Sequence, residues 1–289
     1  MNFTKLQSAG NDFVLVETGD FQRDWSAVAV AICDRHFGVG ADGLLLLLPS
    51  DTAHFQMRMF NPDGSEAEIC GNGLMCMVKY AATKGLLADI ESDWIKVETA
   101  ADIRKARIYQ EKGKPADIQV TMGVPRFGAK DIPAVIKEGS RDIVDIKFML
   151  SYHVNVEYRE LVLDLVSVGN PHAVYFGPDT VSDFPLSQIG PRVEHLSIFP
   201  QRINFEVARV VSREQIEARV WERGVGETLA CGSGACAIAV SARLRGYIDD
   251  KVDIKLPGGI LKVEWDGVGE IFLSAPAEAV FHGEWLQEV

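Results

Sequence analysis

The chain lacks any long apolar run, and none of its hydrophobic stretches approaches the roughly 18 consecutive residues of a membrane-spanning helix. Residues 44–48, all leucine, form the most apolar stretch, and their number suits a buried strand. The N-terminal residues lead directly into a predicted strand, so we expect no signal peptide. We therefore expect no membrane as a partner.

Cysteine is scarce, and its spacing excludes two common uses. The 5 cysteines form an odd set, which disfavours a secreted disulfide framework and favours a reducing, cytoplasmic environment. No Cys-x-x-Cys pair occurs, and the spacings from Cys70 to Cys76 and from Cys231 to Cys236 do not suit zinc. We expect no metal site from these cysteines.

Basic charge is also lacking, because 29 Lys and Arg residues face 41 Asp and Glu residues, for a net charge of −12. This balance disfavours a nucleic acid or an anionic membrane as partner. The glycines of residues 38–43 resemble a nucleotide-binding loop only weakly. No Lys-Ser/Thr pair follows them, and a strand rather than a helix comes next, so we reject both the P-loop and the dinucleotide-binding motif.

What the chain does contain is a glycine-rich motif at residues 221–236, which predicts a strand, a tight turn and then a helix. Cys231 stands where the helix should begin, directly before a Gly-x-Gly sequence. Backbone N–H groups at a helix start have no internal partners and carry partial positive charge. A thiol placed there ionises more easily than a free one, and the glycines let a ligand approach the backbone closely.

The same motif occurs earlier, at residues 59–73, where Cys70 also precedes Gly-x-Gly. When the two cysteines are aligned, Phe60 pairs with Trp221, and Gly85 pairs with Gly246 where each helix should end. Further upstream, residues 9–12 resemble residues 168–171. We infer two structurally related halves, each presenting one cysteine at a helix N-terminus.

Two helices follow these cysteines, and their composition predicts that both are buried. Residues 74–83 and 235–244 are apolar around the whole helix circumference. Further helices are expected at residues 25–35, capped by Asp24, and at residues 189–199. Short alternating segments elsewhere predict strands joined by hairpins, so the expected class is α+β.

Three hypotheses compete for Cys70 and Cys231. Buried structural thiols would not need the surrounding glycines, and zinc ligands would be spaced differently. The third hypothesis is acid–base chemistry, in which two thiols face one carbon from opposite sides. Inverting a stereocentre by proton transfer needs a base on one face and an acid on the other, and a thiol with a tuned pKa serves in either role. Opposed helix N-termini would stabilise the carboxylate beside the developing carbanion.

These residues resemble a known family, the diaminopimelate epimerases, over nearly the whole chain. The motifs that carry the resemblance are residues 10–13, 60–65, 70–73, 169–172 and 222–236. Two departures stand out. Residues 74–76 are Leu-Met-Cys where many members carry an arginine before the second cysteine of this helix, and Gly43 stands where some members have glutamine.

The resemblance implies a role for each site residue. Cys70 and Cys231 would be the two catalytic thiols, and His172 and Glu222 would adjust their pKa values. The backbone N–H groups that would hold the carboxylate at the reacting centre belong to Gly71, Asn72, Gly232 and Ser233. The residues that would hold the distal amino-acid end of the substrate are Asn11, Asn61, Asn170, Asn204, Glu222 and Arg223.

The resemblance also implies the architecture and the partners. Two pseudo-symmetric α+β domains, each a mostly antiparallel sheet wrapped around a central helix, would span residues 1–123 and 124–276, and the strand at residues 277–289 would return to the first. The implied reaction converts LL-2,6-diaminopimelate to the meso isomer, in lysine and peptidoglycan precursor biosynthesis. We expect no cofactor and a homodimer.

Two alternatives stay open from the sequence alone. One is another two-thiol racemase of the same fold, acting on proline or hydroxyproline. Arg223 and Glu222 argue instead for a substrate with a second amino-acid end, because Arg matches a carboxylate and Glu pairs with an ammonium group. The other alternative is a non-catalytic module that binds small anions, or acts in redox chemistry, at the two helix starts.

Overall fold

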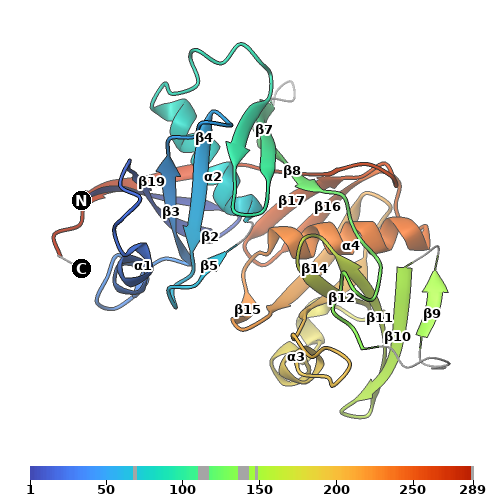
Figure 1. Ribbon diagram of the computed structural model, residues 1–289. Coiled ribbons are helices and arrows are strands. Elements are labelled where there is room, and N and C mark those ends of the chain that lie inside the picture. Colours follow the sequence, from blue (N-terminus) through green and yellow to red (C-terminus); the bar gives the residue numbers. More distant parts are fainter. Residues whose placement is uncertain (68–69, 110–116, 136–142, 147–148, 288–289) are drawn as a thin grey trace. The chain divides into compact units, whose positions relative to one another are not determined.

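A computed structural model describes residues 1–67, 70–109, 117–135, 143–146 and 149–287 of the chain (Figure 1). The chain divides into two compact units, one formed by Met1–Thr121 with Ser274–Val289 and the other by Met122–Leu273. Strands dominate both units, and a few helices pack on them, so the expected α+β class is confirmed.

The first unit is one sheet wrapped around a helix. Its strands are β1 (Asn2–Ser8), β2 (Asn11–Glu17), β3 (Gly43–Leu48), β4 (Phe55–Phe60), β5 (Glu66–Ala67), β6 (Ile95–Glu98), β7 (Ile103–Tyr109) and β19 (Glu278–Glu284), and β8 (Asp117–Gly123) crosses the unit boundary. They pair in the order β19, β1, β2, β3, β4, β6, β7, β8, antiparallel except for β2–β3 and β4–β6. Helix α2 (Gly71–Thr83) contacts at least six of these strands, and Figure 1 shows it enclosed by them.

The leucine run of β3 is explained by burial on both faces of this sheet. Leu44, Leu46 and Leu48 pack with helix α1 (Trp25–Cys33) in one hydrophobic cluster. Because side chains alternate along a strand, Leu45 points to the opposite face, where α2 lies. A run of five buried leucines therefore joins two layers of core.

The second unit repeats this arrangement. Its strands are β9 (Ile143–Ile146), β10 (Met149–Val156), β11 (Arg159–Ser167), β12 (Pro171–Phe176), β13 (Asn204–Val210), β14 (Gln215–Glu222), β15 (Gly226–Thr228), β16 (Lys251–Leu256) and β17 (Gly259–Glu264), and β18 (Ile271–Ala275) crosses the unit boundary. They pair in the order β9, β10, β11, β12, β13, β14, β16, β17, and only β12–β13 and β14–β16 are parallel. Helix α4 (Gly232–Arg245) contacts five of them (orange in Figure 1).

The two units share the register of their strands as well as the strand order. In the parallel pair β2–β3 of the first unit, Phe13 lies opposite Gly43, and in the pair β12–β13 of the second, His172 lies opposite Asn204. Both units also carry the same cross-strand ion pair. Arg58 holds Glu66 at 2.7 Å, and its counterpart Arg219 holds Glu227 at 2.8 Å. The two halves inferred from the sequence are therefore real structural equivalents.

Both central helices end in the predicted way. Gly85 and Gly246 have φ values of 73° and 78°, which is the left-handed region that favours glycine. The residue after each glycine returns a backbone hydrogen bond to the last helical turn, 2.9 Å in both cases. This arrangement satisfies carbonyls that would otherwise lack a partner at the helix end.

Two helix predictions hold with shifted bounds, and the strands β5, β10 and β15 were not predicted. Helix α1 stops at Cys33, and Asp24 caps it by accepting from the backbone N–H of Ala27 at 3.0 Å. Helix α3 (Leu186–Glu194) begins three residues before the predicted start and ends five before the predicted end. Strand β10 was missed although its residues 150–156 alternate between apolar or aromatic and polar side chains.

The packing of α3 on β14 depends on one glycine. A Cβ atom added at Gly190 would lie 2.6 Å from the Trp221 indole, closer than real contacts allow. We expect Gly190→Ala to lower the free energy of unfolding by about 1–3 kcal/mol, as overpacking usually does. Urea unfolding followed by tryptophan fluorescence measures this loss. Gly19→Ala is the matched control, because its added Cβ meets no atom within 4 Å, and equal stability of the two variants would contradict the packing argument.

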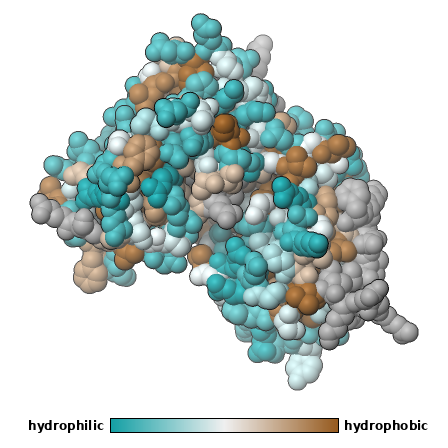
Figure 2. Space-filling view, viewed as in Figure 1, coloured by the Kyte–Doolittle hydropathy of each residue, from teal (hydrophilic) through white to brown (hydrophobic). Residues whose placement is uncertain are grey.

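The surface of the molecule is mainly hydrophilic on the face that Figure 2 shows, with hydrophobic residues in small separate groups. Within the part of the chain that the structure describes, no helix is both long and apolar enough to cross a membrane.

Candidate functional site

Cys70 stands immediately before helix α2, as the sequence predicts. It is the N-cap residue, with extended backbone angles, and its half-buried side chain accepts a hydrogen bond from the backbone N–H of Gly73 at 3.2 Å. The sulfur therefore lies at the positive end of the helix, where a thiolate is favoured over its position in open solvent.

The second glycine of each Gly-x-Gly sequence is required by close packing. A Cβ atom at Gly73 would lie 2.9 Å from Leu45 and 3.3 Å from the sulfur of Cys70. At the equivalent Gly234, it would lie 3.1 Å from Glu206 and 3.4 Å from the sulfur of Cys231. The helix start can approach the underlying strand only because both positions lack a side chain.

In the first unit, Asn72 connects the cysteine turn to the loop between β1 and β2. Its Nδ2 donates to Oδ1 of Asn11 at 3.3 Å, and Nδ2 of Asn11 donates to Asp42 at 2.8 Å. The Oδ1 atom of Asn72 is buried and has no hydrogen-bond partner among the described residues. A buried acceptor of this kind is usually satisfied by a ligand or water.

A network of charges holds Asn11 in place. Arg35 pairs with Asp12 at 2.8 Å and with Asp42 at 2.7 Å, and Lys5 also pairs with Asp12. Burial raises the pKa of Asp12, but hydrogen bonds from Arg35 and Lys5 outweigh it and leave that pKa below its ordinary value. Asp42 thus supports a candidate substrate residue, and sequence reasoning missed it because its partners are distant along the chain.

Asn61 and the two departures from the family pattern, Gly43 and residues 74–76, also belong to the first unit. Asn61 is held in its turn, where Nδ2 donates to Ser65 at 2.9 Å. Gly43 occupies the position that Asn204 has in the second unit, and a Cβ there would lie 3.0 Å from Met59 and from the carbonyl of Phe60. Residues 74–76 are fully buried core side chains of α2.

In the second unit, Cys231 stands immediately before α4 with similar extended backbone angles. Its side chain is buried, and the sulfur lies 3.5 Å from the hydroxyl of Ser233. Burial raises its pKa well above the ordinary value, and the charges of Glu222 and Glu206 add to this. Hydrogen bonds from Ser233 and from the backbone of Gly234 act in the opposite direction. The balance favours the neutral thiol.

His172 is connected to this thiol through Asn170. Its imidazole is fully buried, with Nε2 at 2.9 Å from Oδ1 of Asn170. Asn170 in turn donates from Nδ2 to Ser233 at 3.2 Å. The other ring nitrogen, Nδ1, lies 2.7 Å from a carboxyl oxygen of Glu206. Glu206 was expected only as part of a strand, and no local motif distinguishes it.

Hydrogen bonds from several neighbouring groups hold the loop that carries Glu222 and Arg223 in place. Asn204 accepts from the backbone N–H of Arg223 at 2.9 Å and donates to the carbonyl of Pro171 at 2.8 Å. The hydroxyl of Thr228 donates to Glu222 at 2.6 Å. The half-buried Arg223 side chain contacts the carbonyl of Gln201 at 3.3 Å. Asn204 therefore positions the loop that carries the two charged candidates.

Glu194 is a second support of this loop that the sequence did not reveal. Its buried carboxylate accepts from the backbone N–H of Gly224 at 2.9 Å and from the indole of Trp221 at 2.8 Å. A carboxylate that accepts two N–H groups is well compensated for its burial. The helix that carries Glu194 thus fixes both ends of the turn.

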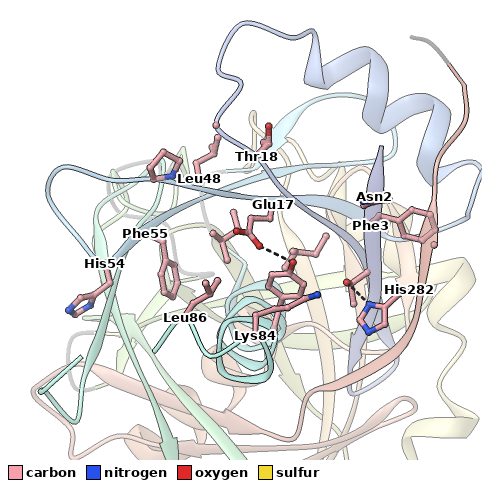
Figure 3. Close-up of a pocket in the computed structure, with 17 residues that line it drawn as sticks. Asn2, Phe3, Glu17, Thr18, Leu48, His54, Phe55, Lys84, Leu86 and His282 are labelled. Carbon is pink, nitrogen blue, oxygen red and sulfur yellow. Dashed lines mark hydrogen bonds between the residues drawn. The ribbon is translucent and has the colours of Figure 1, made fainter. Parts of the chain in front are cut away.

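A cavity of the first unit lies away from these groups. It has a volume of about 1090 Å³, and its lining includes Glu17, Tyr80, Lys84 and His282 (Figure 3). Tyr80 donates to Glu17 at 3.0 Å across it. Lys84 marks the C-terminal end of α2, about 20 Å along the helix axis from its start. This cavity is therefore separate from the cysteine turn.

Among the described residues, no group of three or more His, Cys, Asp or Glu side chains could hold a metal ion.

The structure brings the sequence-predicted site residues together within each unit. In the first unit these are Cys70, Gly71, Asn72 and Asn11, and in the second they are Cys231, Gly232, Ser233, Asn170, His172 and Glu222.

Comparison with known proteins gives a consistent result. The sequence model described as diaminopimelate epimerase matches residues 3–128 and 165–280. A diaminopimelate epimerase of Moorella thermoacetica is 43% identical over 288 residues, which cover 99% of each chain. That of Desulfovibrio desulfuricans is 44% identical over 287 residues, covering 99% of this chain and 98% of the relative.

Solved structures share the fold at much lower identity. A PhzF-family phenazine biosynthesis protein of Bacillus anthracis matches with a TM-score of 0.71 and 17% identity, over 99% of both chains. A hydroxyproline epimerase of Agrobacterium vitis matches with a TM-score of 0.69 and 14% identity, over 98% of this chain and 91% of that one. These matches support the predicted two-domain fold.

Proposed function

The chain belongs to the diaminopimelate epimerase family, and from this premise we propose that Cys70 and Cys231 are the two thiols that exchange a proton with the substrate. The enzyme is an isomerase that converts LL-2,6-diaminopimelate to meso-diaminopimelate, a step of lysine biosynthesis. The observation that carries the proposal is the repeated geometry of the two thiols. Each is the N-cap of the buried central helix of its unit, directly before Gly-x-Gly.

The proposed chemistry is a two-base proton transfer. A thiolate removes the proton from the α-carbon and becomes a thiol, and the other thiol gives its proton to the opposite face of the carbanion and becomes a thiolate. The reverse reaction exchanges the two roles. The proposal requires that both sulfur atoms reach the same substrate carbon when the substrate is bound.

The carboxylate beside the reacting carbon is assigned to the two helix starts. Backbone N–H groups of Gly71, Asn72, Gly232 and Ser233 belong to first helical turns, where they have no internal partner. Charge that develops on this carboxylate as the carbanion forms is stabilised by such fixed dipoles. Glu222 opposes ionisation of Cys231, and His172 acts on the same thiol through Asn170 and Ser233.

The distal amino-acid end of the substrate is assigned to the polar groups around these turns. The residues of this assignment are Asn11, Asn61, Asn170, Asn204, Glu222 and Arg223. Arg223 supplies the fork of donors that suits a carboxylate, and Glu222 the charge that suits an ammonium group. Relatives that are 42–44% identical act on this substrate by name, whereas the proline racemase and hydroxyproline epimerase structures are only 12% and 14% identical.

We place the enzyme in the cytoplasm and expect a homodimer. All five cysteines are free thiols, which suits a reducing compartment. Val280 and Phe281 of β19 expose about half or more of their side chains, and these two apolar residues offer a contact for a second copy. The net charge of −12 argues against nucleic acid as a partner.

The decisive test of the reaction is incubation with LL-diaminopimelate in D₂O. We expect meso-diaminopimelate that carries deuterium at the inverted α-carbon, because the returning proton comes from a thiol that has exchanged with solvent. Chiral chromatography with mass spectrometry measures both properties. Deuterium uptake with proline but not with diaminopimelate would support the proline-type racemase instead, and binding without any exchange would support a non-catalytic module.

A further inference from the structure

The two units differ at one buried pair of positions beneath their cysteine turns. The repeat places Phe13 of β2 opposite the strand that carries Leu45, and both side chains are fully buried and apolar. In the second unit the equivalent positions hold His172 and Glu206, also fully buried. Leu45 and Glu206 are true counterparts, because each lies closest to the second glycine of its Gly-x-Gly sequence.

A buried carboxyl group in place of leucine lowers stability unless hydrogen bonds or an opposite charge compensate, since burial disfavours its charged form. Oε1 of Glu206 contacts Nδ1 of His172 at 2.7 Å, whereas Oε2 is buried without a hydrogen-bond partner among the described residues. Burial raises the pKa of Glu206, His172 opposes this, and the charge of Glu222 adds to it. The carboxyl group and the imidazole therefore compete for one proton on the line between them.

The hydrogen bonds beyond His172 have a fixed direction. Oδ1 of Asn170 can only accept, so the Nε2 atom that faces it must carry a hydrogen. Nδ2 of the same amide donates to the hydroxyl of Ser233. The hydroxyl has then accepted one bond and keeps its own hydrogen for the sulfur of Cys231, 3.5 Å away.

We propose that Glu206 is a positioning residue for the second thiol, which keeps Nε2 of His172 protonated so that Asn170 and Ser233 present a hydrogen-bond donor to Cys231. This inference rests on the proposed role of Cys231 as a catalytic thiol. If the shared proton lies on Nδ1, the carboxylate accepts it and Nε2 is still N–H. If it lies on Oε1, the carboxyl group donates to Nδ1 and Nε2 is again N–H. The donor reaches Ser233 in either case.

The first unit has no equivalent of this chain of donors at its Phe13 and Leu45 positions. Cys70 receives its hydrogen bond from the backbone N–H of Gly73 instead. The thiolate form of Cys231 is opposed by burial and by the charges of Glu222 and Glu206. It is supported by a side-chain network that begins at His172 and Glu206, whose counterparts Phe13 and Leu45 are apolar. The two thiols of a nearly symmetric reaction are stabilised by different means.

The first test uses the unmodified enzyme. Side-chain nitrogen NMR of the isotope-labelled histidines reports whether each ring nitrogen carries a hydrogen. We expect Nε2 of His172 to be protonated throughout pH 6–9, with only the proton between Nδ1 and Glu206 changing its position. A bare Nε2 at any pH in this range would overturn the proposal, and this result does not depend on the folding of any variant.

The second test is a double-mutant cycle on thiol reactivity. Glu206→Met keeps the approximate volume but removes the partner of Nδ1, and Ser233→Ala removes the last donor of the chain. The readout is the pH midpoint of iodoacetamide labelling of Cys231, with Cys70 in the same sample as internal reference. We expect Ser233→Ala to raise the Cys231 midpoint by about one pH unit, roughly a tenfold loss of thiolate. Glu206→Met should raise it by less, because it also removes the Glu206 charge, which itself disfavours the thiolate. Neither variant should change the Cys70 midpoint.

The double variant decides between a directed chain and a general structural effect. If Glu206 acts through Ser233, the double variant shifts the midpoint no further than Ser233→Ala alone. Additive shifts, or an unchanged midpoint in Glu206→Met, would overturn the proposal. Leu45→Met is the control for a buried substitution at the matched position, and it should leave the Cys231 midpoint unchanged.

Failure of this inference can be told apart from failure of the proposed function. Labelling measures thiol ionisation without turnover, so it is informative even if Cys231 takes no part in catalysis. In turnover assays Glu206→Met should lower kcat about tenfold and change KM less than threefold, because no substrate contact is lost. A change confined to KM would contradict a role in positioning the thiol.

Discussion

Alanine in place of either Cys70 or Cys231 is expected to lower the rate of diaminopimelate epimerisation by about 10⁴-fold, at the upper end of what one general acid or base contributes. A two-base reaction fails in both directions when either partner is lost, because the carbanion cannot form without a base or cannot be protonated on the other face without an acid. Chiral chromatography of both isomers, each supplied separately, measures the two directions.

The matched controls come from the same two helices. Cys76 and Cys236 lie inside α2 and α4, are fully buried, and have a pKa raised by burial. Their alanine variants should keep epimerase activity within a few fold while losing some stability as cavities form. If Cys70→Ala retained the activity of Cys76→Ala, the thiol would have no role in proton transfer.

Much of the site is predictable from sequence because its signals are local and repeated. A cysteine before Gly-x-Gly at a predicted helix start occurs twice with matched flanking residues, and the structure shows both as N-caps with similar backbone angles. The terminating glycines Gly85 and Gly246 occupy the same offset and the same left-handed conformation. Local backbone chemistry of this kind needs no knowledge of distant partners.

The supporting residues were not predictable, for the opposite reason. Glu206, Glu194 and Asp42 act through contacts with groups about 30 positions away, and each lies in a segment whose pattern indicates only a strand, a helix or a loop. Burial is what gives these carboxyl groups their importance, and burial is decided by tertiary packing. Strand β10 is a different case, because its residues 150–156 carry the local alternation of a strand and were nevertheless missed.

The second large effect is expected at Arg223, the residue assigned to the distal carboxylate. Arg223→Met should lower kcat/KM for diaminopimelate by about 100-fold or more, since charge-assisted hydrogen bonds contribute about 1.5–3 kcal/mol each and a forked pair makes two. The fold should be little affected, because the Arg223 side chain is only half-buried. The hydrogen bond from its backbone N–H to Asn204 is also retained in the variant.

Lysine makes this prediction specific, because it is diaminopimelate without the distal carboxylate. The unmodified enzyme should exchange the α-hydrogen of L-lysine with D₂O far more slowly than that of diaminopimelate, and Arg223→Met should leave this slow exchange unchanged. Mass spectrometry measures deuterium uptake by both substrates with the unmodified enzyme and with the variant. An equal loss on lysine and diaminopimelate would show that Arg223 acts on the reacting end, through Glu222 or the helix starts, rather than on the distal carboxylate. Arg223→Lys should recover little, because a single ammonium group cannot reproduce the planar fork.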